Sequence, residues 1–426
     1  MNNLKLTFFA LPLAIFSSTL YSQVALEEVV VTAQKTEESL QDTPIAVTAI
    51  TEDTIQDLNI TSARDMQGIA PNVMLLPAPA NNTAASLAIR GGVAMNPAIT
   101  WEPSVGTYVD GVYMGKTQGG MWDLVDLERV EILRGPQGTL YGRNTLAGAV
   151  NFISKKPSGE GVKGSITIGS YGLKHGRLIA DYALTDNFFT KVVINKKSRD
   201  GFVKNQPGPY QAFDGVVPNN TNPPTKELDV IDSTGFKMSM YYAGDNTDIE
   251  LSYDWTDQDN TPPHPQLGNM ASWWADALGF GASPATGGLQ VAPVHLYART
   301  GLDKYTSLDN EMYETSVVEG FHFKITRQTG IGELKLTYAD RKLDWDDQLD
   351  MDGTPHYIFH TARHTTYSSK TVELQLTGSN DFMSYVAGYY QFDDDAFTDN
   401  PQSGFLGGFA IDQKYSGGGD ANAFYA

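Results

Sequence analysis

Residues 236–255 read FKMSMYYAGDNTDIELSYDW, and this stretch decides the fold class. Apolar residues occupy alternate positions from Phe236 to Tyr242 and again from Ile249 to Trp255. A period of two predicts β-strands that each have one apolar face. The residues between them, Gly244 to Thr247, are typical of a tight turn. The stretch is therefore predicted to be a β-hairpin, a unit that soluble sandwiches and membrane barrels share.

The same alternation recurs after Pro157 and predicts about ten strands, the last of which starts near Ala421. Tight turns are expected at Thr185 to Asn187, Gly244 to Thr247, Gln328 to Gly332 and Gly378 to Asp381. Long connections are expected at Gly201 to Ser233, Gln258 to Asn310, Asp344 to Thr366 and Asp393 to Gly419. Short and long connections alternate along the chain, so they lie at opposite ends of the sheet. This arrangement is typical of an outer-membrane β-barrel, whose short turns are periplasmic.

Composition agrees with that class and excludes others. The 426 residues include 30 Lys plus Arg and 50 Asp plus Glu, and the net charge of −20 makes nucleic acid an unexpected partner. The absence of Cys excludes disulfides and thiolate metal sites. There are 41 Gly, 21 Tyr and 19 Phe, a mixture that favours β-structure. The mean hydropathy of −0.28 is compatible with a barrel, because only alternate residues face lipid.

The N-terminus has the pattern of an export signal. Lys5 precedes a mostly apolar run from Leu6 to Phe16, and small residues follow it. We predict a signal peptide over residues 1–22, removed near Ser22. The run is shorter than the roughly 20 residues that a membrane-spanning helix needs. The export signal leaves the periplasm, secretion and an outer-membrane barrel open, and the spacing of the connections favours the bacterial outer membrane as the location.

Between this signal and the strands lies a region with mixed signals. Thr61 or Ser62 could cap a short helix that continues to Ile69. Short strands are predicted at Leu87 to Ile89, Gly106 to Val109 and Arg129 to Leu133. These elements predict a compact mixed α/β domain rather than part of a barrel.

Several motifs in this region resemble the plug domain of TonB-dependent outer-membrane transporters. The motifs are Leu26 to Gln34 (LEEVVVTAQ), Asp65 to Val73 (DMQGIAPNV), Ile89 to Gly91 (IRG), Val105 to Val112 (VGTYVDGV) and Asp126 to Asn151 (DLERVEILRGPQGTLYGRNTLAGAVN). The resemblance implies a mixed α/β plug over 44–156, followed by an antiparallel transmembrane β-barrel from 157 to 426. The family barrel has 22 strands. Since about ten are present, we expect a sequence truncated at its C-terminus.

The resemblance also implies a TonB box and linker over residues 23–43. The box residues are Glu27, Glu28, Val29, Val30, Val31, Thr32 and Ala33. Three consecutive Val in a flexible polar stretch suit pairing by strand addition. The expected partners are TonB with ExbB and ExbD, which transmit the proton-motive force, and outer-membrane lipid and lipopolysaccharide. We expect a monomer.

The implied function is active import of a scarce ligand, such as a ferric siderophore or another iron complex. Haem, cobalamin and oligosaccharide are alternative substrates, and an outer-membrane adhesin or enzyme is the alternative outside transport. Charges expected to hold the plug to the barrel are Arg90, Glu128, Arg129, Glu131, Arg134 and Arg143. Residues expected to face the ligand are Asn81, Asn82, Met95, Trp101, Lys116, Met121, Trp122, Trp273 and Trp274.

Candidates for metal binding or catalysis are few. His356, His360 and His364 are spaced four apart, which places them on one side of a helix or a strand. Asp350 and Asp352 resemble the start of a calcium loop, but the first and last ligands of that motif are missing. The sequence contains no Gly-x-Ser-x-Gly, His-Glu-x-x-His or phosphate-loop motif. We therefore expect no catalytic residue, no metal and no cofactor, and we predict that the protein is not an enzyme.

Overall fold

A computed structural model of the chain was analysed. It describes residues 29–33, 35–36, 38–78, 81–94, 98–118, 126–205, 223–263, 305–306, 308–353, 357, 359–404 and 409–426. The predicted signal peptide and the box residues Glu27 and Glu28 lie outside the described residues.

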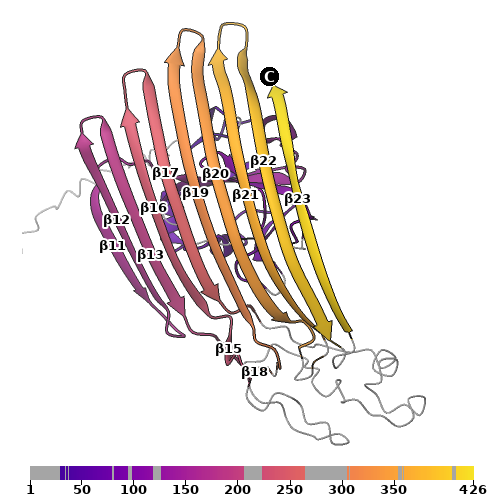
Figure 1. Ribbon diagram of the computed structural model, residues 1–426. Helices are drawn as coiled ribbons and strands as arrows, with labels where there is room; N and C mark the ends of the chain where they lie inside the picture. The colour runs from indigo at the N-terminus through magenta and orange to yellow at the C-terminus, as the bar shows by residue number, and fades with distance from the viewer. Residues whose placement is uncertain are drawn as a thin grey trace, which may run out of the picture.

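A ten-stranded antiparallel sheet, called the wall below, forms the larger part of the molecule (Figure 1). Its strands are β11 (Gly161–Ile168), β12 (Lys174–Thr185), β13 (Phe188–Arg199), β16 (Ile231–Ala243), β17 (Thr247–Asn260), β19 (Tyr313–Thr329), β20 (Gly332–Asp350), β21 (Phe359–Ser379), β22 (Ser384–Gly404) and β23 (Phe409–Tyr425). Each strand pairs with the next in this order. The wall is part of a barrel, with β11 and β23 at its edges.

The two faces of the wall have the inverse of a soluble protein's polarity. On β20, the outward Leu334 and Leu336 are 37% and 36% exposed, whereas the inward Thr337 is 5% exposed. On β21, Leu374 is exposed while Glu373 and Gln375 are buried. Apolar residues on the open face and polar residues on the enclosed face are the pattern of a membrane barrel. A sandwich would bury the apolar face instead.

The four predicted tight turns are confirmed, whereas only two of the four predicted long connections, β13 to β16 and β17 to β19, are long. Tight turns join β12 to β13, β16 to β17, β19 to β20 and β21 to β22, at the upper end of the wall in Figure 1. The long connections predicted at Asp344 to Thr366 and Asp393 to Gly419 are wrong in length, because β20 to β23 continue through most of both. Backbone pairing persists there although few side chains are apolar, since ladder hydrogen bonds do not depend on side-chain type.

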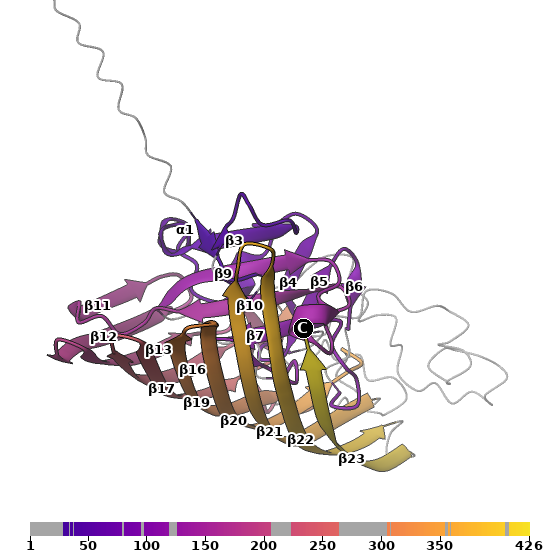
Figure 2. The same ribbon diagram turned by 90° about the horizontal axis from the view of Figure 1, so that it is seen from above.

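The N-terminal domain, called the plug below, packs against the concave face of the wall (Figure 2). Its main sheet has the order β3-β9-β10-β7-β8. The bounds are β3 (Val47–Thr51), β7 (Val105–Val109), β8 (Val112–Tyr113), β9 (Leu127–Arg134) and β10 (Gly148–Ser154). Only β10 and β7 pair in parallel. Val130 and Ile132 on β9 and Val150 on β10 are fully buried in the plug core.

A second, three-stranded sheet and short helices complete the plug. The strands are β4 (Val73–Pro77), β5 (Ala85–Ile89) and β6 (Gly92–Val93), and the helices are α1 (Glu52–Asp57), η1 (Ala63–Met66) and α2 (Gly138–Tyr141). The predicted helix from Thr61 or Ser62 to Ile69 is wrong in kind, because only the 3-10 turn η1 forms. The Asp65 carboxylate accepts hydrogen bonds from the main-chain N–H groups of Thr61 and Ser62, both at 2.9 Å, which fixes this tight turn.

Small strands lie outside these sheets. β1 (Val30–Val31) pairs with β2 (Glu38–Ser39), and β14 (Val203–Asn205), β15 (Glu227–Leu228) and β18 (Tyr305–Thr306) form a further small sheet. Among the described residues, no helix has the length and apolar character that would let it cross a membrane.

Candidate functional site

The candidate site is the contact between the plug and the wall, and a buried lysine organises its first region. The Lys191 side chain on β13 is 4% exposed, and its Nζ lies 2.8 Å from Asp126 Oδ2. The same ammonium donates hydrogen bonds to the main-chain oxygens of Lys155 at 2.9 Å and Lys156 at 3.1 Å. It also lies 3.7 Å from Asp181 Oδ2. A wall residue therefore holds the segment through which the plug continues into the wall.

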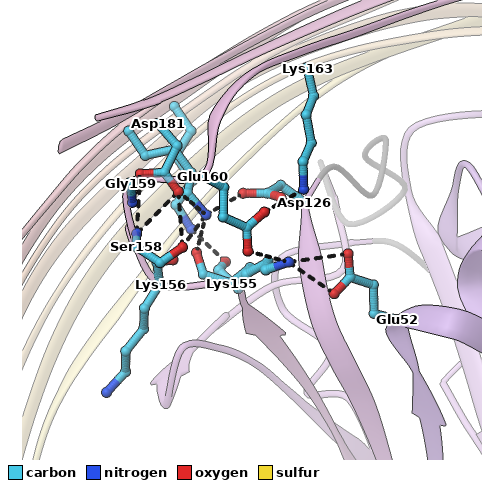
Figure 3. Close-up of polar contacts among 12 residues, drawn as sticks. Glu52, Asp126, Lys155, Lys156, Ser158, Gly159, Glu160, Lys163 and Asp181 are labelled. Carbon is cyan, nitrogen blue, oxygen red and sulfur yellow. Dashed lines mark hydrogen bonds and ion pairs between the residues drawn. The ribbon is translucent and has the colours of Figure 1, made fainter. Parts of the chain in front are cut away.

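The first residues of the wall are tied into the same region (Figure 3). Asp181 on β12 accepts hydrogen bonds from the main-chain N–H groups of Ser158 at 3.1 Å and Gly159 at 2.8 Å. Gly159 has φ +82°, a left-handed conformation that suits glycine. Because both carboxylate oxygens of Asp181 accept hydrogen bonds, its buried charge is compensated.

An exposed ion cluster flanks this junction (Figure 3). Lys155 Nζ lies 3.2 Å from Glu52 Oε2 and 2.9 Å from Glu160 Oε1, and Lys163 also pairs with Glu160. Hydrogen bonds from Lys163 and Lys155 lower the pKa of Glu160 to about 2. The cluster connects α1 of the plug to the start of β11.

A second polar contact lies deeper, between β7–β8 of the plug and β16 of the wall. Lys237 Nζ lies 2.9 Å from Asp110 Oδ2 and donates to Ser154 Oγ at 2.6 Å. The Ser154 main-chain N–H donates to Asp110 Oδ1 at 2.7 Å. Burial, the largest single effect, would raise the pKa of Asp110. Attraction to Lys237 and His322, together with hydrogen bonds from Ser154 and Lys237, outweighs burial and holds that pKa well below its usual range. Asp110 is therefore ionised under ordinary conditions.

At a third contact, the wall binds the loop between β4 and β5 through main-chain groups. The Glu314 carboxylate on β19 accepts hydrogen bonds from the N–H groups of Asn82 at 2.6 Å and Thr83 at 2.9 Å. Trp345 Nε1 on β20 donates to Thr83 Oγ1 at 2.8 Å. Asn81 and Asn82, which were predicted to face a ligand, are buried at this contact. The buried N–H groups of this loop need acceptors, and the wall provides them.

The predicted TonB box is partly packed in the structure. Val31 and Ala33 are fully buried among residues of the plug and wall, whereas Val30 is 42% exposed. The Thr32 N–H donates to Glu131 Oε1 at 2.8 Å. Lys35 Nζ lies 3.2 Å from Glu373 Oε1 on β21. The stretch that was predicted to be flexible thus contains the β1–β2 hairpin and contacts the wall.

The six charges predicted to hold plug and wall together have mostly other surroundings. Glu128 pairs with Arg129, and Arg129 Nε lies 2.8 Å from Glu131 Oε1, all within the plug. Arg143 lies 3.2 Å from Glu102 and 5.6 Å from the ring centre of Phe392 on β22. Arg90 is exposed and Arg134 is half-buried. Ion pairs to the wall strands are made instead by Lys35, Asp110, Asp126 and Lys156, the last of which lies 3.0 Å from Glu250 on β17.

Of the other residues predicted to face a ligand, two can be placed. Trp101 is 57% exposed. The Lys116 Nζ lies 3.2 Å from Glu102 Oε1, and its side chain is 6% exposed. The remaining candidates lie outside the described residues: Met95, Met121, Trp122, Trp273 and Trp274.

Two of the three histidines lie on β21, and His356 lies outside the described residues. His360 Nε2 lies 2.8 Å from Asp309 Oδ1, and His364 Nδ1 lies 2.8 Å from Asp346 Oδ1. The two histidines therefore have separate carboxylate partners.

The wall residues that contact the plug were not predicted from the sequence. Lys191, Lys237, Glu314 and Glu373 all lie on the enclosed face of their strands. One signal in the sequence could have identified them: each is a charged residue on the strand face opposite the apolar residues. That signal shows which face a charge occupies but not its partner on the plug.

Fold and site together define a class: a plugged, partial β-barrel of the outer-membrane type, with the plug held by ion pairs, hydrogen bonds and small apolar clusters. Comparison with known proteins shows what the chain is similar to. Residues 39–149 match the model of the TonB-dependent Receptor Plug Domain. The catecholate siderophore receptor Fiu of Escherichia coli strain K12 is 30% identical over 165 residues, 37% of this chain and 20% of that protein. The vitamin B12 transporter BtuB of Vibrio vulnificus is 28% identical over 181 residues, 41% of this chain and 28% of that protein.

Solved structures show the same fold over most of the chain. The ferric yersiniabactin uptake receptor FyuA from Yersinia pestis has a TM-score of 0.62 at 14% identity, covering 89% of this chain and 61% of that one. The closed form of Fiu from E. coli K12 has a TM-score of 0.60 at 17% identity, covering 91% and 54%. This chain thus spans little more than half of those receptors. Residues 39–149 therefore match the plug domain of TonB-dependent receptors, and the described chain shares the fold of solved siderophore receptors.

Proposed function

We propose that this chain is the plug and part of the wall of a TonB-dependent importer of ferric siderophores. One observation carries the proposal: the plug is a folded domain with its own apolar core, and breakable polar contacts hold it against the wall. Hydrogen-bonded ion pairs can be exchanged for water when two surfaces separate, and the apolar clusters across the contact, around Phe392 and Ile99, are smaller than the plug's own core.

The N-terminal segment supports energy coupling. Val30 is exposed next to the buried Val31 and Ala33, so one edge of β1 is accessible while its neighbours anchor it. An exposed strand edge can accept another strand through main-chain hydrogen bonds. In our proposal, TonB pairs with residues 27–33, and the pull that it transmits from the ExbB–ExbD complex loosens the plug.

The substrate class rests on the relatives. Fiu is named a catecholate siderophore receptor, and FyuA is described as a ferric yersiniabactin uptake receptor. BtuB, by contrast, is named a vitamin B12 transporter. We therefore propose an iron chelate as the substrate. Cobalamin is the alternative substrate, and the experiment must distinguish between the two.

The test compares two substitutions of Val30 in the receptor, expressed in a host that lacks its own siderophore receptors. Val30→Pro removes a main-chain N–H and prevents strand pairing at this edge. Val30→Ala is the matched control, which keeps the backbone unchanged. We expect Val30→Pro, and deletion of residues 27–33, to reduce uptake of radioactive iron from ferric siderophores to background. Binding of the siderophore to the cell surface should persist in both variants.

Two results would contradict the proposal. If iron uptake is unchanged in both Val30→Pro and the deletion, energy coupling does not pass through this segment. Uptake of radiolabelled cobalamin, with no uptake of any ferric siderophore tested, would replace the iron chelate by the alternative substrate.

A further inference from the structure

Two Asp–His pairs lie one above the other on the same face of the β20–β21 pair, at the end with long connections. In the strand register, Asp350 is opposite His360 and Asp346 is opposite His364. Residues four apart in a strand share a face, and the two pairs are separated by about 13 Å along the strands. The expectation that His360 and His364 lie on one side is thereby confirmed.

A further Asp lies next to each Asp–His pair, so each pair becomes a cluster of three potential metal ligands. Only one of the two clusters is enclosed. Asp309 joins Asp350 and His360, and Asp344 joins Asp346 and His364; in each cluster the ligand atoms lie within 4.8 Å of one another. The Asp309 and His360 side chains are 3% and 13% exposed, and Asp350 is 0% exposed. By contrast, the Asp346 and His364 side chains are 37% and 46% exposed.

The enclosed carboxylate is held in position by main-chain donors. Asp350 Oδ1 accepts hydrogen bonds from the N–H groups of Asp352 and Gly353, both at 3.1 Å. Asp350 Oδ2 accepts from the Asp309 N–H at 3.3 Å. Gly353 has φ +71°, which favours glycine at this turn. The carboxylate is thus oriented before any ion binds, which reduces the entropic cost of binding.

The negative charge in the enclosed cluster exceeds its positive charge. Asp309 and Asp350 are two buried acids, and the one side-chain cation that pairs with either, among the described residues, is His360 when it is protonated. Within the same part of the chain, neither acid forms an ion pair with Lys or Arg. A buried carboxylate without a counter-charge is costly. A divalent cation would neutralise both acids at once.

We propose that Asp309, Asp350 and His360 bind a divalent first-row transition metal ion, such as Zn²⁺. The donors are two carboxylate oxygens and the Nε2 of an imidazole. Sites with oxygen donors alone favour Ca²⁺ or Mg²⁺, whereas an imidazole nitrogen shifts preference towards Zn²⁺ and its neighbours. Three protein ligands leave at least one position for water.

The ion acts as a structural cross-link at the rim of the wall. Asp309 precedes β19, and it is 41 residues from Asp350 and 51 residues from His360. A shared ion would join the start of β19 to the β20–β21 connection. This site is separate from the proposed import function, and each can fail without the other.

The test titrates Zn²⁺ alone into the purified, chelator-treated protein in detergent micelles, followed by calorimetry. We expect one saturable site in the wild type. His360→Ala and the near-isosteric Asp309→Asn should each weaken Zn²⁺ binding at least tenfold. His364→Ala, in the exposed cluster, is the matched control and should leave the affinity unchanged. Bound Zn²⁺ should also raise the melting temperature of the wild type and the control.

The proposal is overturned if the wild type shows no saturable binding, in which case the cluster is an imidazole–carboxylate hydrogen bond only. It is also overturned if His360→Ala and Asp309→Asn bind Zn²⁺ as tightly as the wild type. Should His360→Ala fail to fold, as judged by circular dichroism, Asp309→Asn decides the outcome.

Discussion

At the scale of single residues, the contact between plug and wall depends on a few charges whose burial differs. The side chains of Lys191 and Asp181 are 4% and 3% exposed, whereas those of Lys163 and Glu160 are 57% and 33% exposed. Water screens the exposed pair and keeps its contribution small. Removal of one partner from the buried group leaves uncompensated charge, which is much more costly.

Lys191→Met should therefore destabilise the junction strongly. The substitution keeps side-chain length but leaves Asp126 and Asp181 without their ammonium partner. We expect the free energy of unfolding to fall by about 3–5 kcal/mol. Lys163→Met is the matched control and should change it by less than about 1 kcal/mol. Urea denaturation followed by tryptophan fluorescence measures both, and equal effects would show that the buried lysine has no special role.

At the scale of elements, the wall strands are defined by the contrast between their two faces. Leu336 on β20 is directly opposite Leu374 on β21, and both side chains are exposed on the outward face. Thr337, the next residue, is buried towards the plug. The sequence predicted this alternation, but the alternation does not show which face the lipid covers. The position of the plug decides it, because the plug occupies the other face.

Leu336→Lys should impair insertion into lipid, since it places a charge on the outward face. A lysine on the lipid face of a barrel costs about 2–4 kcal/mol near the bilayer midplane. Leu336→Met is the control, because it keeps an apolar side chain of similar volume. We would refold both variants into lipid vesicles at a series of urea concentrations and measure the folded fraction. The shift between the two curves gives the difference in folding free energy between Leu336→Lys and Leu336→Met. Equal folded fractions would mean that this face does not contact hydrocarbon.

At the scale of the whole molecule, two folded parts meet across a contact that includes buried ion pairs as well as small apolar clusters, and acid should weaken the ion pairs. Burial raises the pKa of Asp110, but Lys237, His322 and the Ser154 N–H together hold it below its usual range. A carboxylate with a lowered pKa in the folded state stabilises that state fully above its unfolded pKa of about 4. This stabilisation is lost as the pH falls from that value towards the folded pKa.

Asp110→Asn should remove this part of the pH dependence. The variant should be less stable than the wild type above about pH 5, because Lys237 loses its charged partner. Below about pH 4 the difference in unfolding free energy should shrink by about 1.4 kcal/mol per pH unit, because the Asp110 carboxylate takes up a proton in the unfolded wild type while it stays ionised in the folded state. Urea midpoints measured from pH 6 to pH 2 test this expectation. If the difference in urea midpoint between the wild type and Asp110→Asn stays constant from pH 6 to pH 2, Asp110 is not the titrating group.

Much of the fold could be predicted from local pattern, while the site could not. Alternation and turns predicted the ten strands, and the motif from Asp126 to Asn151 predicted the plug, in which β9 and β10 form the buried centre. The ends of the strands were predicted less well than their existence. For example, β22 and β23 continue through most of the loop that was expected at Asp393 to Gly419. Hydrogen bonding between neighbouring strands extends β22 and β23 beyond their predicted ends. The sequence of one strand does not show which strand pairs with it or how far the pairing continues.

The sequence by itself determined the class of this protein, because the period of the side chains and the spacing of the turns are local properties. Only the tertiary structure decided which charges meet: Lys191 with Asp126, Lys237 with Asp110, and His360 with Asp309. These partners are far apart in the chain, and their energies depend on burial and on distances of a few ångströms. Such distances are set only when the plug packs against the wall and the strands take their register.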